Sequence, residues 1–378
     1  MKSMTKKHLS RILTLLLALL FLFGCRPKSR IPGCGPKIVE VPVPVADTIE
    51  VTDCMDRTVS VPKDVSRVAC LYAYAGHVCV LLHSEDKIVA VVNGLKRDQL
   101  MLRKIPAISD MPCPYNSGAV NIEELAAASP DLIFLRTENL ADPGEIEKLD
   151  GLGIPYVVID YVTMEDQIRS IEAMGKALGE DARALAYTAY YRSTVEMVKD
   201  RLSAVPEEDR VRVYHSVNEV VRTDIPGTLS FEILDAAGCR NVVSSADELR
   251  LDGGKGMTTV EQIYVWDPDV VLVTEPDAAA YFRTNEKFSG LRAVREGTVF
   301  QLPVGISRWA HPGSLESPLA TLYIAKLLYP DLFHDIDFEK ELTDFYERFF
   351  DITLSEEDIS AILSGEGMRA PKEGKNEI

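Results

Sequence analysis

The chain has 378 residues, of which 46% are hydrophobic, and this length suits a globular body of two lobes or domains better than one small core. Its formal charge is −17 at pH 7, and the first 24 residues carry basic side chains but no acid, so the remainder is more acidic still. So acidic a body argues against binding to nucleic acid or directly to anionic lipid, because both need positive charge.

The N-terminus carries a targeting signal. An apolar run from Ile12 to Phe23 follows the basic residues, and it is too short to span a bilayer but suits the core of a signal peptide. The run ends in LFGC, which resembles a bacterial lipobox, although Phe23 is bulkier than the usual occupant of its position. This resemblance implies that residues 1–24 are removed and that Cys25 is lipidated, which anchors the protein outside the cytoplasm. The alternative is an ordinary signal peptide followed by an incidental cysteine.

Six further cysteines follow, and an extracytoplasmic location permits disulfides among them: Cys34, Cys54, Cys70, Cys79, Cys113 and Cys239. Their pairing cannot be read from the sequence. No Cys-x-x-Cys occurs, so a thiolate zinc or redox site has little support. Cys70 and Cys79 lie in apolar elements, where we expect small core residues.

Residues 25–48 are dense in proline and glycine and are interpreted as an extended tether. After the tether, short β-branched runs alternate with helical stretches, a pattern typical of parallel α/β sheets. The predicted strands are Arg67–Leu71, Lys87–Val92, Asp131–Leu135, Pro155–Asp160, Val211–His215, Val270–Thr274 and Thr298–Leu302.

An internal repeat indicates two lobes of similar architecture. Residues 120–135 read VNIEELAAASPDLIFL and residues 258–273 read TTVEQIYVWDPDVVLV. In each, a Glu near a helix start is followed by Pro-Asp and an apolar strand. Asn121 and Thr259 are favourable N-caps, which places Glu123 and Glu261 in first helical turns, where negative charge is stabilised. A chance match of two helix–strand units is the alternative.

Helix-forming residues dominate the stretch between the repeats. Gly179 divides it, and the second part, from about Asp181, is long enough for a helix of more than about 30 Å. We expect this helix to join the two lobes, with an internal core helix as the alternative. The predicted organisation is an N-terminal lobe over 49–162, a linking helical segment over 163–205, a C-terminal lobe over 206–366 and a polar tail over 367–378. Three helices are predicted late in the chain, at Gly313–Leu328, Asp337–Phe349 and Ser355–Leu363, and the first of them is predicted to be amphipathic.

Signatures of catalysis are missing from the sequence. There is no His-Glu-x-x-His, no phosphate-binding Gly-x-x-x-x-Gly-Lys-Ser/Thr and no Gly-x-Ser-x-Gly. Gly253–Gly256 is interpreted as a mobile loop. His215 and Ser216 end a predicted strand, but a catalytic pair there would need a third partner. We therefore expect neither an enzyme nor a resident cofactor.

Three stretches carry a resemblance over the body from about Ile49 to Leu363. They are VTDCMDRTVSVPKDVSRVACL (51–71), the pair of Glu units, and RWAHPGSLESPLATLYIAKLLYPDLF (308–333). In order and spacing they are similar to the substrate-binding proteins of iron-siderophore, haem and cobalamin ABC importers. The resemblance implies an α/β fold of two Rossmann-like lobes with parallel sheets, joined by a single long helix, with the ligand in the cleft between the lobes.

The resemblance also implies partners. A member of this family is a monomer that docks on a membrane permease, which a cytoplasmic ATPase drives, and one surface Glu of each lobe pairs with permease arginines. The matching positions are Glu123 and Glu261. Simple compensation of the helix dipole is the alternative role for both side chains.

The cleft should be lined by loops at the ends of strands. Its aromatic side chains offer flat faces for a chelate, arginine can bind carboxylates in a fork, and His215 or a tyrosine oxygen can touch a metal. With six histidines in the chain, a clustered-histidine site for a naked metal is not expected. The candidate ligand-binding residues are Tyr72, Tyr74, Asn93, Tyr115, Asn116 and Arg136 in the first lobe and His215, Arg222, Lys255, Glu275, Arg308 and Trp309 in the second.

The sequence leads to the hypothesis of a receptor that captures an iron chelate such as a ferric siderophore. The same role for cobalamin or haem is the first alternative, and a small oxyanion remains open. More distant alternatives are a tetrapyrrole or metallocluster enzyme on a similar fold and a surface protein that binds other proteins. Two lobes joined by a stiff helix predict only small closure on binding.

Overall fold

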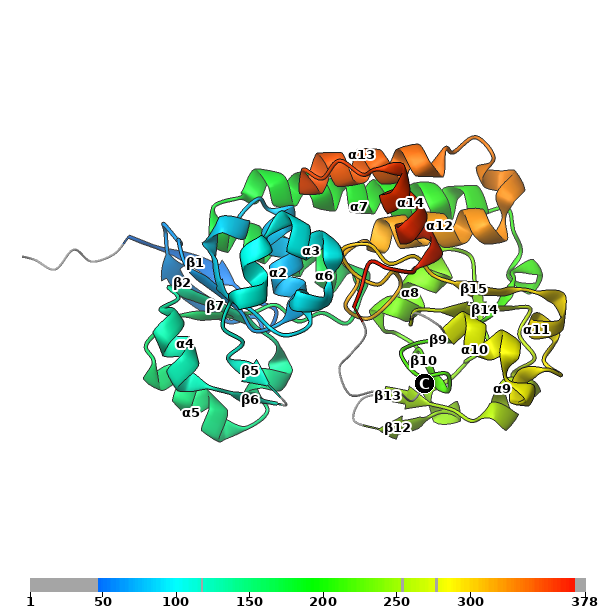
Figure 1. Cartoon of the computed structure of the whole chain (residues 1–378), viewed down its shortest axis with the longest axis horizontal. Coiled ribbons are helices and arrows are strands. Elements are labelled where there is room, and N and C mark those ends of the chain that lie inside the picture. The colour runs from blue at the N-terminus through cyan, green and yellow to red at the C-terminus, as the bar shows by residue number, and fades with distance from the viewer. Residues whose placement is uncertain (1–46, 117, 253–254, 276–277, 371–378) are drawn as a thin grey trace, which may run out of the picture. The chain divides into compact units, whose positions relative to one another are not determined.

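The computed structural model describes residues 47–370, apart from 117, 253–254 and 276–277 (Figure 1). The predicted signal peptide, Cys25, Cys34 and the tether up to residue 46 lie outside these described residues, as does the tail after Ala370. Within the described ranges, no helix combines the length and the apolar character that crossing a bilayer requires.

The N-terminal lobe begins with a β-hairpin of β1 (Thr48–Thr52) and β2 (Thr58–Pro62). Asp53 closes its turn, because one carboxylate oxygen accepts the backbone N–H of Met55 at 2.9 Å and the other accepts from the Arg57 guanidinium at 2.7 Å. This turn lies in the first of the three resembling stretches, residues 51–71.

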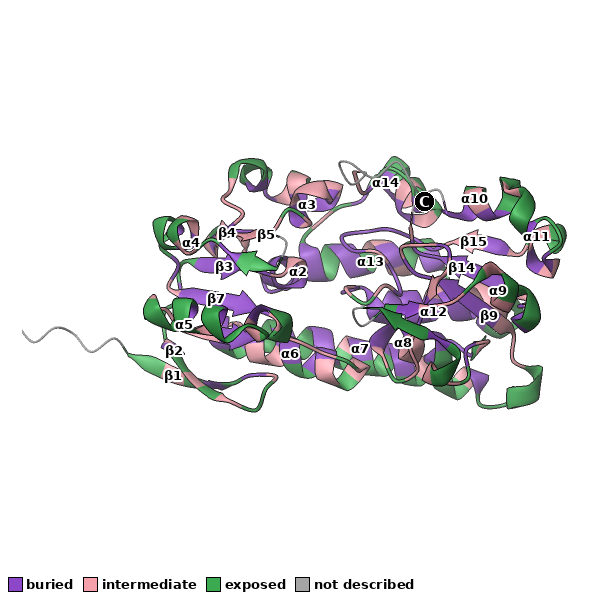
Figure 2. Cartoon of the chain, turned by 90° about the horizontal axis from the view of Figure 1, so that it is seen from below, coloured by how far each residue is buried: buried purple, intermediate pink, exposed green. Residues whose placement is uncertain are grey.

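A parallel sheet with the strand order β4–β3–β7–β8 forms the core of this lobe. Its strands are β3 (Val68–Cys70), β4 (Ile88–Ala90), β7 (Leu132–Leu135) and β8 (Tyr156–Val158). The other elements of the lobe are α2 (Ala73–Leu81), α3 (Gln99–Lys104), β5 (Tyr115–Asn116), β6 (Ala119–Val120), α4 (Ile122–Ala128) and α5 (Pro143–Gly151). All four residues of β7 are buried, as expected for a parallel strand that is covered on both faces (Figure 2).

Two helices then lead from the first lobe to the second. In α6 (Met164–Leu178) the Thr163 side chain caps the N-terminus, and Gly179 ends the helix with a left-handed φ of 75°. The following helix, α7 (Asp181–Leu202), has 22 residues and is therefore about 33 Å long. Figure 1 shows α7 running alongside both lobes, as the sequence predicted for the joining helix.

The C-terminal lobe repeats the parallel sheet, with the strand order β11–β9–β14–β15. These strands are β9 (Arg212–Ser216), β11 (Arg240–Asn241), β14 (Val270–Val273) and β15 (Val299–Gln301). An antiparallel sheet is added by β10 (Arg222–Thr223), β12 (Arg250–Asp252) and β13 (Lys255–Met257), and the helices are α8 (Leu229–Ala236), α9 (Val260–Trp266), α10 (Ala278–Thr284) and α11 (Arg292–Glu296). Each of the seven predicted strands is found, with shorter bounds at most ends, and the predicted α/β fold of two lobes is confirmed.

The internal repeat is also confirmed. Helices α4 and α9 each have seven residues, and strands β7 and β14 each have four. The Asn121 side chain accepts the N–H of Glu124 at 3.1 Å, and the Thr259 hydroxyl accepts the N–H of Gln262 at 3.1 Å. Both helices therefore start with the side-chain cap that the sequence predicted.

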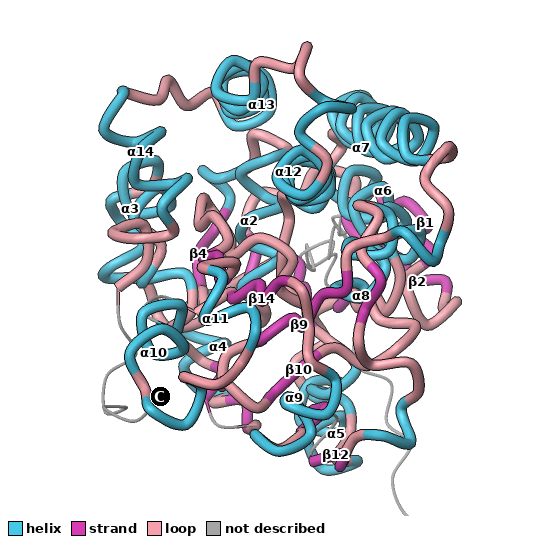
Figure 3. Tube along the Cα trace, turned by 90° about the vertical axis from the view of Figure 1, so that its right-hand side faces the viewer, coloured by secondary structure: helices cyan, strands magenta, loops and turns pink. Residues whose placement is uncertain are grey.

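The last helices are α12 (Ser317–Leu328), α13 (Phe338–Phe350) and α14 (Glu356–Ser364). The sequence placed the start of α12 at Gly313 and predicted an amphipathic helix, and both points were wrong. Pro318, which suits a first helical turn, marks the real start, and most of α12 is buried beside α7 and α8 (Figure 3).

The glycine-rich loop prediction also needs correction. Gly253 and Gly254 lie outside the described residues, but Lys255 and Gly256 belong to strand β13. A Cβ at Gly256 would lie 2.8 Å from the Leu249 side chain. Close packing, rather than mobility, is therefore the reason for this glycine.

Five cysteines fall in the described residues, and all five are free thiols there. Cys70 and Cys79 are fully buried, with their sulfurs 3.9 Å apart, in agreement with their predicted place in the core. Short 3₁₀ helices complete the description: η1 (Glu85–Lys87), η2 (Leu95–Arg97), η3 (Pro106–Asp110), η4 (Thr137–Leu140), η5 (Glu207–Asp209), η6 (Ala246–Glu248), η7 (Glu286–Phe288) and η8 (Pro330–Phe333).

Candidate functional site

A cavity of about 730 Å³ lies between the two lobes. The carboxyl ends of several parallel strands open into it: Tyr72 follows β3, Arg136 follows β7, and Val217 follows β9. This is the edge at which open parallel sheets bind ligands. The described lining comprises Tyr72, Ala73, Tyr74, His77, Arg136, Glu138, Tyr161 and Val162 from the first lobe, Val217, Arg222–Ile225, Thr228–Ser230, Lys255, Gly256, Ser307, Arg308 and His311–Gly313 from the second, and Arg369.

The N-terminal wall is aromatic. The Tyr72 and Tyr161 hydroxyls are 3.1 Å apart, and the Tyr74 and Tyr161 ring centroids are 4.7 Å apart. Arg136 lies over the Tyr72 ring at 4.7 Å and is held by Asp160 at 3.4 Å. Burial raises the pKa of Tyr72 and Tyr161, so both phenols are neutral hydrogen-bonding groups beside one cation.

The C-terminal wall is built around Arg308. Its guanidinium bonds to Asn218 and Glu275 and lies 2.8 Å from His311 Nε2. Burial, followed by the charges of Arg308 and Arg222, holds the pKa of His311 well below its usual value, so the imidazole is neutral. This wall therefore presents a cationic guanidinium beside a neutral imidazole.

Glu316 holds the loop that carries Arg308 and His311. Its buried carboxylate accepts the backbone N–H groups of Ile306 and Ser307, each at 2.9 Å, and also bonds to the Tyr346 hydroxyl. Ala310, inside the same loop, has a φ of 54°, a left-handed conformation that is uncommon for alanine. Strain of this kind persists only where surrounding contacts over-determine the backbone, and it is typical of binding sites.

Arg222 stands on β10 and lines the cavity. Among the residues that the structure describes, no carboxylate lies within ion-pair distance of its guanidinium. Behind it, His215 is fully buried, and its Nδ1 lies 2.7 Å from Asp224, which does line the cavity. The guanidinium of Arg222 is thus available to an anion in the cleft.

The lining of the cavity is richer in basic than in acidic side chains. Basic residues on its described walls are Arg136, Arg222, Lys255, Arg308 and Arg369, whereas the acids are Glu138 and Asp224, and Asp224 is engaged with His215. Arg136, Arg308 and Arg369 also pair with the carboxylates of Asp160, Glu275 and Asp98. In a protein of charge −17, this local excess of basic side chains on the walls favours an anionic ligand.

The structure brings six of the twelve predicted ligand residues to the cavity: Tyr72, Tyr74, Arg136, Arg222, Lys255 and Arg308. Two others support it from behind, because His215 bonds to Asp224 and Glu275 bonds to Arg308. Tyr115 and Asn93 are not among the described lining residues: the Tyr115 hydroxyl donates to Glu138 at 3.4 Å, and Asn93 is exposed to solvent. The Asn116 side chain lies outside the described residues.

Trp309 lies in the core rather than in the cleft. It is fully buried, and its ring packs edge-on against Tyr323 and Phe338. The sequence could not separate it from Arg308, because neighbouring residues of an irregular loop point in directions that only packing decides.

Several lining residues were missed by sequence reasoning: Tyr161, His77, His311 and Arg369. Tyr161 and His311 carried a usable signal, since one follows the predicted strand at 155–160 and the other lies in the RWAHPG stretch. His77 lies within an apolar helix and Arg369 in the polar tail, so neither had a local signal.

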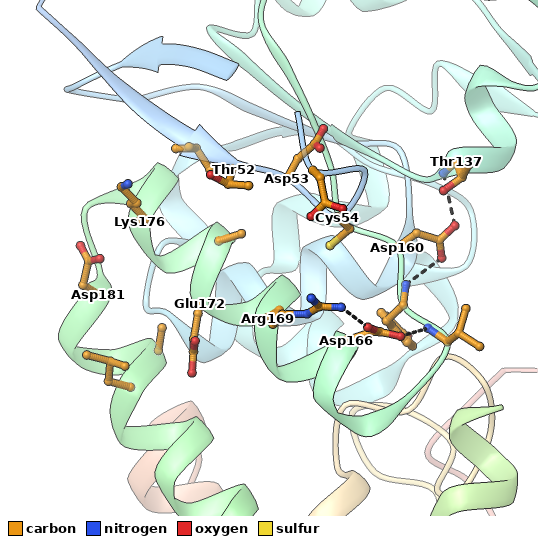
Figure 4. Close-up of a pocket in the computed structure, with 17 residues that line it drawn as sticks. Thr52, Asp53, Cys54, Thr137, Asp160, Asp166, Arg169, Glu172, Lys176 and Asp181 are labelled. Carbon is orange, nitrogen blue, oxygen red and sulfur yellow. Dashed lines mark hydrogen bonds and ion pairs between the residues drawn. The ribbon is translucent and has the colours of Figure 1, made fainter. Parts of the chain in front are cut away.

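A second cavity, of about 670 Å³, lies in the N-terminal lobe between the β1–β2 turn and helices α6 and α7 (Figure 4). The charged residues of its lining are mainly acidic, Asp166 pairs with Arg169, and Asp160 accepts the N–H of Thr137 at 3.3 Å. It therefore does not match the cationic cleft as a site for an anion.

Glu123 and Glu261 are exposed in the first turns of α4 and α9, as predicted, lie on different lobes and are not among the residues that line the cleft. Within the described residues, no group of three His, Cys, Asp or Glu side chains is placed to hold a metal ion.

Comparison with known proteins identifies this architecture. Residues 68–304 match the model of the periplasmic binding protein family. The chain belongs to this family. Its members are the extracytoplasmic substrate-binding proteins of ABC importers, not enzymes, and they function with a cognate membrane permease.

Individual relatives agree on the fold. The chain is 26% identical over 330 residues to the molybdate-binding protein MolA of Haemophilus influenzae, covering 81% of this chain and 92% of MolA. The MolA structure with molybdate superposes with a TM-score of 0.71 at 24% identity, covering 81% of this chain and 99% of that one. A periplasmic solute-binding protein from Veillonella parvula superposes with a TM-score of 0.71 at 26% identity, covering 84% of this chain and 97% of that one. The Ni-His complex of Helicobacter pylori CeuE superposes with a TM-score of 0.67 at 21% identity, covering 84% of this chain and 99% of that one.

Proposed function

We propose that this binding protein captures an anionic, oxygen-rich metal chelate, with a ferric siderophore as the first candidate, and delivers it to its ABC permease. The observation that carries the proposal is the excess of basic side chains on the cleft walls of an otherwise acidic protein. Forked guanidinium groups pair with carboxylate, hydroxamate or catecholate oxygens. The neutral phenols of Tyr72 and Tyr161 add hydrogen bonds and flat apolar faces.

The size of the cavity supports a chelate over a small ion. A volume of about 730 Å³ lies within the range of about 300–1,000 Å³ that encloses ligands of several hundred daltons. Haem, with its carboxylates, is compatible with the same walls, whereas cobalamin has less use for the basic side chains.

A small oxyanion is the second candidate, because MolA, at 26% identity, is named for binding molybdate. A tetrahedral dianion would use only part of the cavity, most simply beside Arg222 and Arg308. Water would then fill the remainder.

A thermal-shift screen of residues 48–378 tests the proposal with ferric siderophores, haem, cobalamin and molybdate. A ligand at 100 times its dissociation constant adds about 2.7 kcal/mol, which is a rise of roughly 5–10 °C for a body of this size. A shift with ferric chelates supports the first candidate, and a shift with molybdate alone supports the second. A Soret band in the purified protein would indicate haem. If none of these ligands raised the melting temperature, the proposed cargo would be wrong.

Glu123 and Glu261 are the proposed docking points for permease arginines. Two exposed charges on separate lobes fix orientation more than affinity. Reversal of both, Glu123→Lys with Glu261→Lys, should abolish uptake while ligand affinity stays unchanged. The matched control reverses two other exposed helical acids, Glu147 and Glu296, and should leave uptake intact.

Cys25 is the proposed lipid attachment site, and the protein acts as a monomer tethered to the membrane through residues 25–48. Labelling with a radioactive fatty acid should mark the wild-type chain but not Cys25→Ser, which should appear in the soluble fraction. Retention of the label by Cys25→Ser would exclude this site.

A further inference from the structure

The last described residues form a segment, Gly365–Ala370, that we name the C-terminal clasp. It pairs with the N-terminal lobe as a short antiparallel bridge: the N–H of Ala370 donates to Arg97 O at 2.9 Å, and the N–H of Gln99 donates to Met368 O at 3.0 Å. The Arg97 guanidinium donates to Ala370 O at 2.8 Å as well. Residues 367–370, which the sequence assigned to a polar tail, are therefore fixed to η2 and α3.

The same segment is fixed to the C-terminal lobe. Just before it, the carbonyl of Ile362 in α14 accepts the N–H of Val304 at 3.0 Å. Gly365 has a φ of 74°, and a Cβ there would lie 2.6 Å from Leu302 O, so this position requires glycine on two grounds. The clasp thus joins both lobes, on top of the connection that α7 makes.

One side chain of the clasp reaches the ligand cavity. The Arg369 side chain is 12% exposed, lines the cavity, and pairs through one terminal nitrogen with Asp98, which is 1% exposed. Its Nε is buried and has no partner in the described part of the chain. A guanidinium carries five N–H donors, and the contacts to Asp98 leave several of them unused.

His77 shares the Asp98 carboxylate with Arg369. Asp98 also lies 3.0 Å from His77 Nε2, and because a carboxylate only accepts, this nitrogen must carry the proton. Burial lowers the pKa of His77 to about 3, with Arg369 acting in the same direction, so the imidazole is neutral. Asp98 is thus shared between two donors, and the cavity side of Arg369 remains open to a further anion.

We propose that Arg369, presented by the C-terminal clasp, is a ligand-binding residue that pairs with an anionic oxygen of the cargo. The inference rests on the proposed function, since it assumes an anionic ligand. It adds a third structural element to the cleft, so that bound ligand contacts both lobes and the clasp that joins them.

The test compares Arg369→Gln with the matched variant Arg103→Gln. Arg103 also anchors this region, through Asp358 of α14 at 2.9 Å, but it is 52% exposed and does not line the cavity. The affinity of each variant is measured by calorimetry for the ferric chelate or for molybdate, whichever binds the wild-type chain. Arg369→Gln should weaken binding about tenfold or more, because hydrogen bonds to charged groups are the strong ones, while Arg103→Gln should stay within about twofold.

Two truncations separate the clasp from the tail beyond it. A chain that ends after Ala370 should bind like the full-length protein, whereas a chain that ends after Glu366 should lose affinity as Arg369→Gln does. Equal weakening by Arg103→Gln and Arg369→Gln would overturn the inference, because loosening of the clasp would then account for both. Wild-type affinity in Arg369→Gln would also overturn it while leaving the proposed function intact. Failure of the wild-type chain to bind any of the anions would instead overturn the proposed function and this inference with it.

Discussion

The two lobes are copies of one backbone plan that line the cleft with different chemistry. In each lobe an arginine beside the first strand of the parallel sheet caps the C-terminal end of the repeated helix. Arg67, just before β3, donates to Ala128 O at 2.6 Å and to Ser129 O at 2.8 Å. Arg212, at the start of β9, donates to Trp266 O and Asp267 O. Both helices end in a left-handed residue, Ser129 and Asp267 respectively. These shared contacts hold the repeated helices and strands in place, and none of them is made by a residue that lines the cleft.

The cleft walls, in contrast, follow no symmetry. The N-terminal wall uses a cluster of mutually tilted tyrosine rings beside one paired arginine, Arg136, whereas the C-terminal wall adds a three-stranded sheet and the loop around Arg308. The difference teaches that the duplicated sheets fix where ligand binds and that the irregular segments at their carboxyl ends fix what binds. Four predictions test this division, from the largest expected effect to the smallest.

Glu316→Ala should damage the C-terminal wall most. The change leaves the buried Ser307 N–H and the Tyr346 hydroxyl without this acceptor and leaves the Ile306 N–H with the Tyr346 hydroxyl alone, at a cost of about 3 kcal/mol or more in unfolding free energy. Urea unfolding measures it. The exposed Glu347→Ala serves as the control and should change stability by less than about 0.5 kcal/mol. A loss below about 1 kcal/mol for Glu316→Ala would mean that the loop does not depend on this carboxylate.

Arg308→Gln and Arg136→Gln compare the two walls directly. The Arg308 side chain is 15% exposed and that of Arg136 is 33% exposed, so water screens the charge of Arg136 more strongly. We expect a loss in ligand affinity of about 2 kcal/mol for Arg308→Gln and about 1 kcal/mol for Arg136→Gln. Calorimetry with the bound anion gives both values. The reverse order would indicate that the tyrosine wall, and not the basic wall, dominates recognition.

Each lobe also buries a neutral histidine that makes stability depend on pH. The pKa of His77 is lowered to about 3, and that of His311 lies well below its usual value. The unfolded chain takes up protons below about pH 6.5, while the folded chain does not. Stability should therefore fall as the pH is lowered from 7 to 5, by at most about 1.4 kcal/mol per pH unit for each histidine and by less for His311, whose side chain is less deeply buried than that of His77.

Unfolding free energies measured from pH 8 to pH 5 check this slope. His77→Asn should flatten it more than His311→Asn does. An unchanged slope in both variants would show that neither imidazole is held neutral by the fold.

Arg67→Ala and Arg212→Ala should have the smallest and the most equal effects. Each removes the donors that satisfy the carbonyls at the end of one repeated helix, at a cost of about 1 kcal/mol. Equilibrium unfolding measures both, and Arg295→Ala, an exposed change on α11, is the control. If the losses in unfolding free energy of the two variants differed by more than about 1 kcal/mol, the two arginines would not play equivalent roles in the two lobes.

The sequence by itself determined the frame of this protein. Short β-branched runs predicted the seven strands, because a buried parallel strand must be apolar on both faces. Asn121, Thr259 and Gly179 predicted helix ends, since their side-chain or backbone preferences act locally. The repeated Glu units predicted the two lobes, and the order of the motifs predicted the family.

Only the tertiary structure decided which side chains share the cleft. Arg369 and Asp98 stand 271 positions apart and meet because the clasp crosses between the lobes. Trp309 and Arg308 are neighbours in the chain, yet one is buried against Phe338 while the other faces the ligand cavity. Local patterns cannot encode such pairings, because the direction of a loop side chain depends on long-range packing rather than on the periodicity of its own segment.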